Sequence, residues 1–353
     1  MSRYTENAIS GWMQADGPDS DIVISSRIRI ARNVGNEPFP MLATNQQSEE
    51  VLNRVASVLE QPSLRAVGDF DLVSLSGMSD LEKRVLVEKH LISPNLANES
   101  RNGAVILSEN EAISIMVNEE DHLRIQVLYP GFQLKEAWEV AGRIDDIFEA
   151  IVDYAYDEKH GYLTSCPTNV GTGIRASVMM HLPALVMTQQ MNRILQAIQQ
   201  VGLAVRGLYG EGSEVVGNIF QISNQITLGQ TEEEIIDNLH GVARQIIEHE
   251  KAARNKLLAE SRTKLTDRIR RSFGILCYAE IMDSKEAAQR LSDVRLGVDL
   301  GLVEGLAPNV LNELLVMTQP GYLQQHYGRP LSPEERDAHR AKLFRERMRN
   351  QAR

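Results

Sequence analysis

The segment from Val117 to Arg124 constrains the fold most, because it joins two alternating apolar runs through a turn crowded with acids. The flanking runs, residues 112–117 and 123–128, are rich in β-branched side chains and predict the paired strands of a hairpin. Residues 118–122 read Asn-Glu-Glu-Asp-His, whereas a short hairpin turn favours Asn-Gly or Asp-Gly. Taken alone, this turn has a simple interpretation as a solvated acidic loop. The other motifs of the chain favour a functional role for these acids.

A further strand is predicted at residues 22–32, where aliphatic residues alternate with arginine. One face of such a strand is apolar, and the other carries guanidinium groups such as those of Arg27 and Arg29. A charged, solvated face is one interpretation. Such faces usually mix charge signs or use lysine, however, and planar guanidinium groups that point the same way suit phosphate oxygens.

Two loops contain residue types that can do chemistry. Residues 161–175 combine Gly, Pro, Thr and Asn at high density, which predicts a tight loop whose backbone N–H groups can face an anion, with Arg175 at its end. The loop is neither a Walker loop nor a dinucleotide-binding fingerprint. Cys166 within it is either a packed small residue or a thiol activated by a nearby arginine. Residues 209–214 hold glycines around Glu211 and predict a mobile lid.

The remaining periodic segments predict helices and two more strands. Capping boxes are expected at Ser79, Thr231 and Ser332, each followed by Glu three residues later. Helices are expected at residues 48–59, from 79 onward, at 132–155, 187–200, 231–261, 265–282, 285–296 and 310–317, and in a final basic segment from 333. Strands are expected at residues 201–208 and 219–224.

Size and composition limit the class of protein. A chain of 353 residues favours two domains, and no apolar run reaches the roughly 18 residues of a membrane span. The N-terminus lacks the apolar region of a signal peptide, and two cysteines are too few for a disulfide framework. A cytoplasmic protein with reduced thiols is therefore expected. The net charge of −11 argues against general binding of nucleic acid.

Three of these segments, in this order, resemble the catalytic domain of the phosphagen (guanidino) kinases: residues 25–29, the acidic turn 118–122 and the loop 166–175. The resemblance covers roughly residues 10–250. It implies an α+β fold with a central, mainly antiparallel sheet flanked by helices, followed by an all-helical C-terminal domain. The expected domains are 1–260 for catalysis and 261–353 for dimerisation and phosphoarginine binding.

One departure narrows the resemblance to a branch of that family. Members that act on small molecules carry an additional helical N-terminal domain, for which this chain has no room before its first strand at residue 22. A C-terminal extension from about residue 262 stands in its place, and this arrangement resembles the bacterial protein-arginine kinases. Without the cap, the acceptor site is expected to be open enough for an arginine on a protein surface.

The resemblance also implies roles for particular residues. A protonated guanidinium is a poor nucleophile, and two carboxylates can both orient it and remove a proton. Glu120 is implied as the base, Glu211 as its partner across the guanidinium, and Cys166 as the thiol that tunes the acceptor. The implied nucleotide and phosphate contacts are Ser25, Arg27, Arg29, His90, Arg124, Arg175 and Arg206. Adenine contacts are open, because Met179 replaces a histidine of the family.

Ligands outside the catalytic centre are implied in the same way. Arg336, Asp337 and Arg340 match an Arg-Asp-x-x-Arg element implied to bind phosphoarginine allosterically, with both arginines on one helix face. ATP is the expected cofactor, with Mg²⁺ held mainly through its phosphates and no protein metal ligand. The expected partners are proteins with exposed arginine, an activating zinc-binding adaptor, a Clp-type protease and a second copy of the chain; nucleic acid and membrane are not expected.

The expected function is transfer of the ATP γ-phosphoryl group to arginine side chains of proteins, which marks substrates for Clp-type degradation or inactivates repressors. Three alternatives stay open: a small-molecule guanidino kinase without its cap, a non-catalytic phosphoarginine adaptor, and a hydrolase with Cys166 as nucleophile. The presence of Glu120, Glu211 and the arginines argues against the adaptor. The hydrolase has no need of the arginines.

Overall fold

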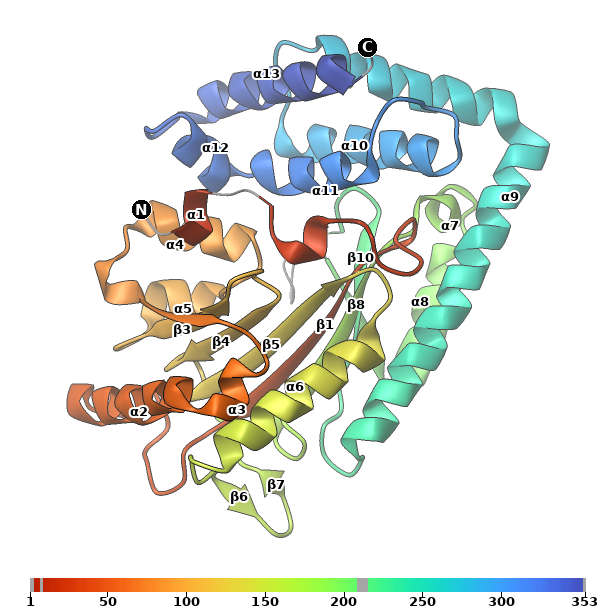
Figure 1. Ribbon diagram of the computed structural model, residues 1–353. Helices are drawn as coiled ribbons and strands as arrows, with labels where there is room; N and C mark the ends of the chain where they lie inside the picture. Colours follow the sequence, from red (N-terminus) through yellow and green to blue (C-terminus); the bar gives the residue numbers. More distant parts are fainter. Residues whose placement is uncertain (1–2, 7–8, 208–214, 352–353) are drawn as a thin grey trace.

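An eight-stranded sheet organises the first part of the chain (Figure 1). The computed structural model describes residues 3–6, 9–207 and 215–351. The strands lie in the order β2-β3-β4-β5-β1-β8-β10-β9, and each neighbouring pair is antiparallel. Their bounds are β1 Val23–Arg32, β2 Phe70–Ser74, β3 Ala104–Ser108, β4 Ile113–Val117, β5 Leu123–Pro130, β8 Ile174–His181, β9 Leu203–Arg206 and β10 Ile219–Asn224. The predicted α+β fold with an antiparallel sheet is confirmed.

The sheet has one apolar and one polar face, because aliphatic and polar side chains alternate along its central strands. Ile28 and Ile30 of β1 are fully buried on the apolar face. Two helices cover this face: α6 (Leu134–Glu149) packs on β1 and β5, and the first half of α9 (Glu232–Tyr278) packs on β8 and β10 (Figure 1). The opposite face carries the arginines predicted from the alternation.

The predicted hairpin is formed by β4 and β5, whose residues Val117 and Leu123 pair directly across the acidic turn. Asn118 adopts a positive φ of 56°, and its N–H donates to the His122 carbonyl oxygen at 3.0 Å. Asn tolerates the left-handed conformation better than most residues do. The turn is therefore closed by its first residue, without the glycine that short hairpins usually need.

Capping boxes were predicted at Ser79, Thr231 and Ser332, and all three are confirmed. In each, the capping residue and the glutamate three residues later exchange hydrogen bonds between side chain and backbone. The other helices of four residues or more are α1 Arg3–Glu6, α2 Asn45–Ser57, α3 Pro62–Arg65, α4 Asp80–Glu88, α5 Pro94–Glu99, α7 Pro183–Met187, α8 Met191–Gln200, α10 Ser284–Asp299, α11 Pro308–Met317, α12 Pro320–His326 and α13 Pro333–Gln351.

Three predicted helix boundaries are wrong. Helix α2 begins before residue 48, because Thr44 and Gln47 form a capping box. Helix α6 ends at Glu149 instead of residue 155, because the chain turns there to pair Tyr154 with Val34. Residues 187–200 do not form one helix, since Gln189 has a φ of 60° and separates α7 from α8.

The predicted break between two helices near residue 261 is confirmed. Helix α9 runs from Glu232 to Tyr278, and Ser261, with a non-helical φ of −141°, divides it into two helical segments at a kink. No glycine or proline marks this break, because the sequence has neither between residues 242 and 273. The kink carries the chain from the sheet to the C-terminal helices.

No helix in the described ranges has the length and apolar character that crossing a bilayer needs.

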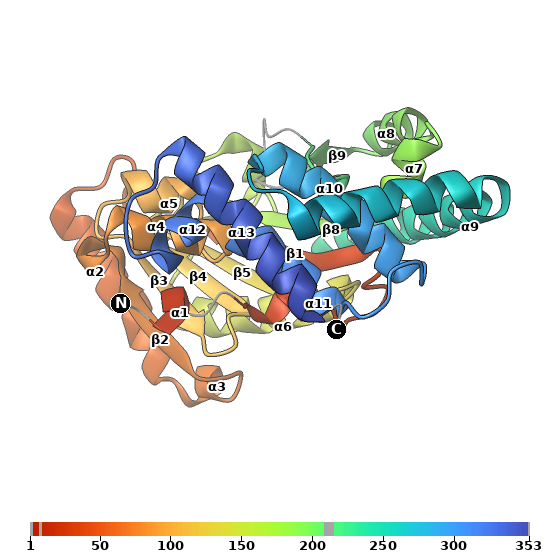
Figure 2. The ribbon, with the colours of Figure 1, turned by 90° about the horizontal axis from the view of Figure 1, so that it is seen from above.

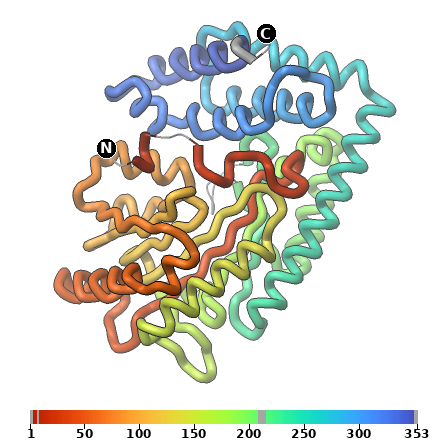
Figure 3. Tube along the Cα trace, viewed as in Figure 1, coloured from red at the N-terminus to blue at the C-terminus, as the bar shows by residue number. Residues whose placement is uncertain are grey.

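The helices α10 to α13 gather at one end of the molecule, and α13 runs diagonally across that end (Figures 1 and 2). They enclose their own apolar core, which includes Leu291, Leu314 and Phe344. The N-terminal segment passes between these helices and the sheet (Figure 3). Its Met13 carbonyl oxygen accepts a hydrogen bond from Asn312, and its Ser20 carbonyl oxygen accepts one from Arg295.

Helix α4 joins the C-terminal helices to the sheet. The buried carboxylate of Glu88, at its last residue, accepts hydrogen bonds from the N–H groups of Gly321 and Tyr322 at 2.7 and 2.8 Å. These amides lie in the first turn of α12, where free N–H groups favour a negative charge. The end of α4 is therefore fixed on one side by the C-terminal helices.

Candidate active site

A cavity of about 370 Å³ lies on the polar face of the sheet and brings most of the predicted site residues together. Those on its wall are Arg27, Arg29, His90, Glu120, Arg124, Cys166, Arg175 and Arg206. Ser25 lines a smaller neighbouring recess that shares Arg27 and His90 with the cavity. Glu211 and the predicted lid lie outside the described residues.

Strand register explains how the arginines meet. Arg29 of β1 pairs with Gln126 of β5 on one side and with Arg175 of β8 on the other. Arg27 and Arg124 lie on the same face because side chains two residues apart along a strand point the same way. Guanidinium groups from the neighbouring strands β1, β5 and β8 therefore converge on one concave surface.

This convergence makes the cavity strongly positive. Burial, together with the charges of Arg124 and Arg175, lowers the pKa of Arg27 to about 10. The pKa of Arg29 falls well below its ordinary value for the same reasons, burial first and then the neighbouring cations. The buried Nε of Arg29 has no hydrogen-bond partner among the described residues. An anion in the cavity would relieve both the charge repulsion and the missing bond.

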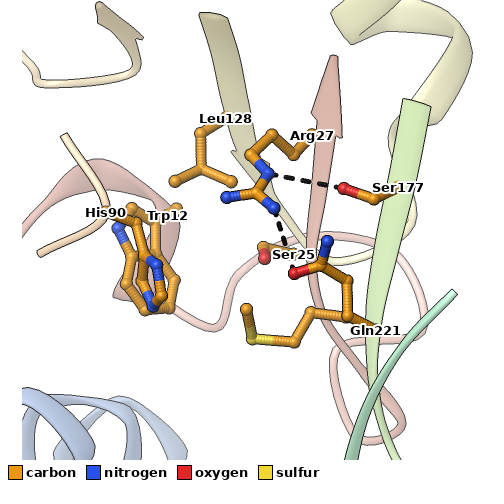
Figure 4. A pocket seen from close by; sticks show the side chains of 8 residues that line it. Trp12, Ser25, Arg27, His90, Leu128, Ser177 and Gln221 are labelled. Atoms are coloured by element: carbon orange, nitrogen blue, oxygen red, sulfur yellow. Dashed lines mark hydrogen bonds between the residues drawn. The ribbon is translucent and has the colours of Figure 1, made fainter. Parts of the chain in front are cut away.

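The recess beside the cavity is lined by the rings of Trp12 and His90 together with polar side chains (Figure 4). Arg27 donates to Ser177 Oγ at 3.4 Å and to Gln221 Oε1 at 3.0 Å, which holds its guanidinium between the two spaces. The Trp12 and His90 rings meet edge to face at 5.5 Å. Burial, and then the charge of the nearby arginines, lowers the pKa of His90 to about 3, so its ring is neutral at physiological pH.

The glutamates of the acidic turn differ in burial: Glu119 is held by protein contacts, and Glu120 faces the cavity. The Glu119 carboxylate accepts a hydrogen bond from Ser93 Oγ at 2.6 Å and forms an ion pair with Arg124 at 2.7 Å. Glu120 also contacts Arg124, at 3.1 Å, but its side chain is 35% exposed and faces the cavity. Burial raises the pKa of Glu120, while Arg124 partly offsets that rise. Among the turn carboxylates, Glu120 is thus the most accessible.

Asp121 and His122 instead hold neighbouring segments. The fully buried Asp121 carboxylate accepts hydrogen bonds from Asn33 Nδ2 and from the Ser165 N–H, both at 2.7 Å. The second bond ties the acidic turn to the residue before Cys166, whose Sγ lies 3.0 Å from Thr168 Oγ1. Asp121 therefore positions the cysteine loop and does not reach the cavity.

The expected anion-facing amides of residues 161–175 are wrong for much of this loop. The N–H groups of Asn169, Gly171 and Thr172 donate to carbonyl oxygens of the protein, as Ser165 does to Asp121. Gly171 is required for packing, because a Cβ there would lie 2.3 Å from the Thr227 carbonyl oxygen. The loop serves as a packed support for Arg175 and Cys166, and side chains supply the positive charge.

His122 gives the acidic turn a pH-dependent stability. Its Nδ1 accepts from the Val34 N–H at 3.0 Å and its Nε2 donates to the Pro38 carbonyl oxygen at 3.1 Å, so the ring must be neutral. Burial lowers its pKa to about 4. Because the unfolded chain then binds more protons than the folded one, stability should fall as pH decreases from about 6.5 to about 4. His122→Gln, which keeps one donor and one acceptor, should flatten this part of a urea-unfolding pH series; an unchanged slope would contradict the assignment.

Several residues on the cavity wall were not predicted from the sequence, including Ser93, Asn95, Asn169 and Gln221. For Ser93 and the adjacent Asn95, the sequence did contain a pattern that could have predicted their position. Ser93 followed by Pro94 is a helix-start pattern, and Ser93 does cap α5 by accepting from the Leu96 N–H. For Gln221, only the pairing of β10 with β8 and β9 shows that it joins the polar face.

The three predicted phosphoarginine-binding residues lie on α13, away from the cavity. Arg340 is only 2% exposed, and its guanidinium donates to the carbonyl oxygens of Thr318 and Met282 and to the Asp337 carboxylate. Arg336 donates to the Leu331 carbonyl oxygen. In this structure Arg340 therefore joins three segments of the C-terminal helices, and its side chain is not presented to solvent.

Comparison with known proteins agrees with this geometry. Residues 50–253 match the family described as ATP:guanido phosphotransferase, C-terminal catalytic domain, and residues 262–353 match the protein-arginine kinase McsB C-terminal domain. A protein-arginine kinase of Brevibacillus brevis is 63% identical over 99% of this chain and 98% of its own length. A protein-arginine kinase of Halalkalibacterium halodurans is 61% identical over 99% of this chain and 98% of its own.

Solved structures share the fold at lower identity. A lombricine kinase superposes with a TM-score of 0.59 at 24% identity, covering 70% of each chain. The duplicated taurocyamine kinase of Schistosoma mansoni gives a TM-score of 0.60 at 21% identity, covering 82% of this chain and 44% of its own. By its sequence over the full length and by its fold, the chain belongs to the protein-arginine kinase family of ATP:guanido phosphotransferases.

Proposed function

We propose that this protein transfers the γ-phosphoryl group of ATP to the guanidinium group of arginine side chains in proteins. The observation that carries the proposal is one cavity whose wall holds both an accessible carboxylate, Glu120, and five arginines from neighbouring strands of the sheet. The names of the full-length relatives support a protein acceptor.

The arginines would bind the triphosphate. Arg29, with its unpartnered Nε, and the flanking Arg27 and Arg175 fit an anion of several charges. Fixed guanidinium groups stabilise charge that develops on the transferring oxygens, and they need no reorganisation to do so. Mg²⁺ bound to those phosphates would add Lewis-acid stabilisation. The neutral ring of His90 and that of Trp12 lie beside this triphosphate site.

Glu120 would act on the acceptor. In the transfer, an arginine nitrogen forms a bond to phosphorus as the bond from phosphorus to the bridging oxygen of ADP breaks, and the nitrogen loses one proton. Glu120 is positioned to accept that proton, and its raised pKa makes it a better base than an ordinary carboxylate. We propose that Glu211 holds the other side of the guanidinium and that Cys166 lies against the acceptor.

Further proposals rest on the family resemblance. Phosphoarginine would mark proteins for a Clp-type protease or inactivate repressors in the cytoplasm, and a zinc-binding adaptor would activate the kinase. The chain would form a homodimer through residues 261–353. The small-molecule kinase stays as the second candidate, because the solved neighbours named for lombricine and taurocyamine share this fold.

One assay separates these candidates. The protein is given radiolabelled ATP and Mg²⁺ with an unfolded protein substrate and free arginine in parallel. Acid-labile label on the protein alone would support the proposal, because P–N bonds hydrolyse in acid more readily than phosphate esters do. Label on free arginine alone would favour the small-molecule kinase. ATP-independent turnover would point to Cys166 as a hydrolytic nucleophile.

We also propose that Arg336 and Asp337 bind phosphoarginine on α13, with Arg340 as the residue that orders them. Arg340→Ala removes hydrogen bonds to two carbonyl groups and to Asp337, so we expect a loss of about 2–4 kcal/mol in stability as well as weaker phosphoarginine binding. Arg336→Ala should weaken binding at little cost to stability. Thermal unfolding with and without phosphoarginine measures both, and an unchanged melting temperature for Arg340→Ala would contradict the structural role.

A further inference from the structure

A second cavity, of about 320 Å³, adjoins the candidate active site and shares three wall residues with it, Asn95, Glu119 and Glu120. The two cavities therefore meet on either side of the residue that we propose as the base. An arginine side chain that reaches Glu120 from this side would leave the adjoining part of its polypeptide in the second cavity. Nothing in the catalytic steps described above uses this space.

The far wall of the second cavity presents apolar side chains to solvent. It includes Met41, which is 72% exposed, and the next residue, Leu42, is 75% exposed. Both lie in a turn that the protein holds in place: the Leu42 N–H donates to the Phe39 carbonyl oxygen at 2.8 Å, and Arg101 Nη1 donates to the Ala43 carbonyl oxygen at 2.9 Å. Two large apolar side chains are thus held exposed at the edge of this cavity.

The charge of the cavity indicates what binds there. Glu99 and Glu120 are its accessible acids, because Glu119 is buried against Arg124, and Arg101 on the same wall is already bonded to the turn. This arrangement favours a cationic ligand and disfavours one with acids next to the cation. The neighbouring apolar turn adds a requirement for hydrophobic surface close to that cation.

We propose that the second cavity and the Met41–Leu42 turn form a docking surface for an extended polypeptide that carries the acceptor arginine. An apolar side chain near the arginine would rest on the turn while the arginine enters the active site. The turn would thus add apolar contact to the substrate next to its arginine. The inference rests on the proposed function and specifies its substrate class.

The test compares two short peptides with one central arginine, one carrying leucine two positions to either side and the other carrying serine there. Met41→Ser/Leu42→Ser should raise KM for the leucine peptide about tenfold, through loss of apolar contact, and leave kcat unchanged. It should leave both constants unchanged for the serine peptide. A control in the same domain is Leu72→Ser/Ile151→Ser, which removes apolar side chains that are 39% and 37% exposed on β2 and after α6, outside both cavities.

Other results would overturn the inference. An equal rise in KM for both peptides would mean that the turn supports the fold or the active site, and no rise for either would mean that it binds nothing. A changed oligomeric state of the double variant in sedimentation, with both peptides affected, would assign the turn to contact between copies of the chain. If the unaltered protein labels neither peptide, nor any unfolded protein, the proposed function itself fails.

Discussion

Glu120→Gln is expected to lower the rate of phosphoryl transfer by about a hundredfold to ten-thousandfold. The substitution keeps the size of the side chain and an oxygen that can accept from Arg124, which now donates to Glu120 at 3.1 Å. It removes the negative charge and with it the ability to accept a proton. Nucleotide affinity should therefore change little, because no nucleotide contact is assigned to this residue.

The pH dependence adds a second readout for the same residue. Because burial raises the pKa of Glu120, activity should decline on the acid side at a higher pH than an ordinary carboxylate would give. The acid limb should disappear from the residual activity of Glu120→Gln. Single-turnover rates across a pH series, with nucleotide affinity measured in parallel, give both quantities.

A matched control is Glu109→Gln, which makes the same charge change at an exposed turn of the sheet, between β3 and β4. It should retain normal activity. Near-normal transfer by Glu120→Gln would show that another group is the base, with Glu119 or the undescribed Glu211 as the next residues to test. A parallel loss of nucleotide binding would instead mean that Glu120 shapes the whole cavity.

The sequence predicted strands β1, β4, β5, β9 and β10 and the arginines of β1, which follow from local alternation, but it did not predict strands β2, β3 and β8. Residues two apart on a strand share a face, so the pattern of β1 alone places Arg27 and Arg29 together. The hairpin of β4 and β5 likewise follows from two adjacent runs. These features need no knowledge of distant parts of the chain.

Other features depend on contacts between residues far apart in sequence, and the sequence did not reveal them. Neighbouring acids of one turn differ in function because Asn33 and Ser165, 88 and 44 positions away from Asp121, bind its carboxylate. Arg340 was expected at a ligand site, and its burial depends on carbonyl groups 22 and 58 positions away. In both cases residue type and spacing identify a candidate, and tertiary contacts decide whether its side chain is available.

Arg29→Met, a substitution within the arginine cluster, is expected to raise the stability of the protein and to lower its activity. Arg29→Met removes a cation whose pKa is lowered first by burial and then by three neighbouring arginines. Because the fold disfavours this charge, the ligand-free variant should be more stable by about 1–2 kcal/mol, which corresponds to a few degrees in melting temperature. Phosphoryl transfer should fall by at least about a hundredfold, because fixed positive charge at the transferring group is lost.

Ligand binding separates this interpretation from a general effect of removing arginine. Mg²⁺ with a non-hydrolysable ATP analogue should raise the melting temperature of the unaltered protein and should stabilise Arg29→Met far less. Arg270→Met, at an exposed position of α9, should change neither the stability nor the response to the nucleotide. A variant Arg29→Met that is less stable and still active would mean that Arg29 supports the sheet and that the anion site lies elsewhere. A gain in stability with a loss of transfer would instead show that the fold tolerates an unfavourable cluster of charges because the reaction needs it.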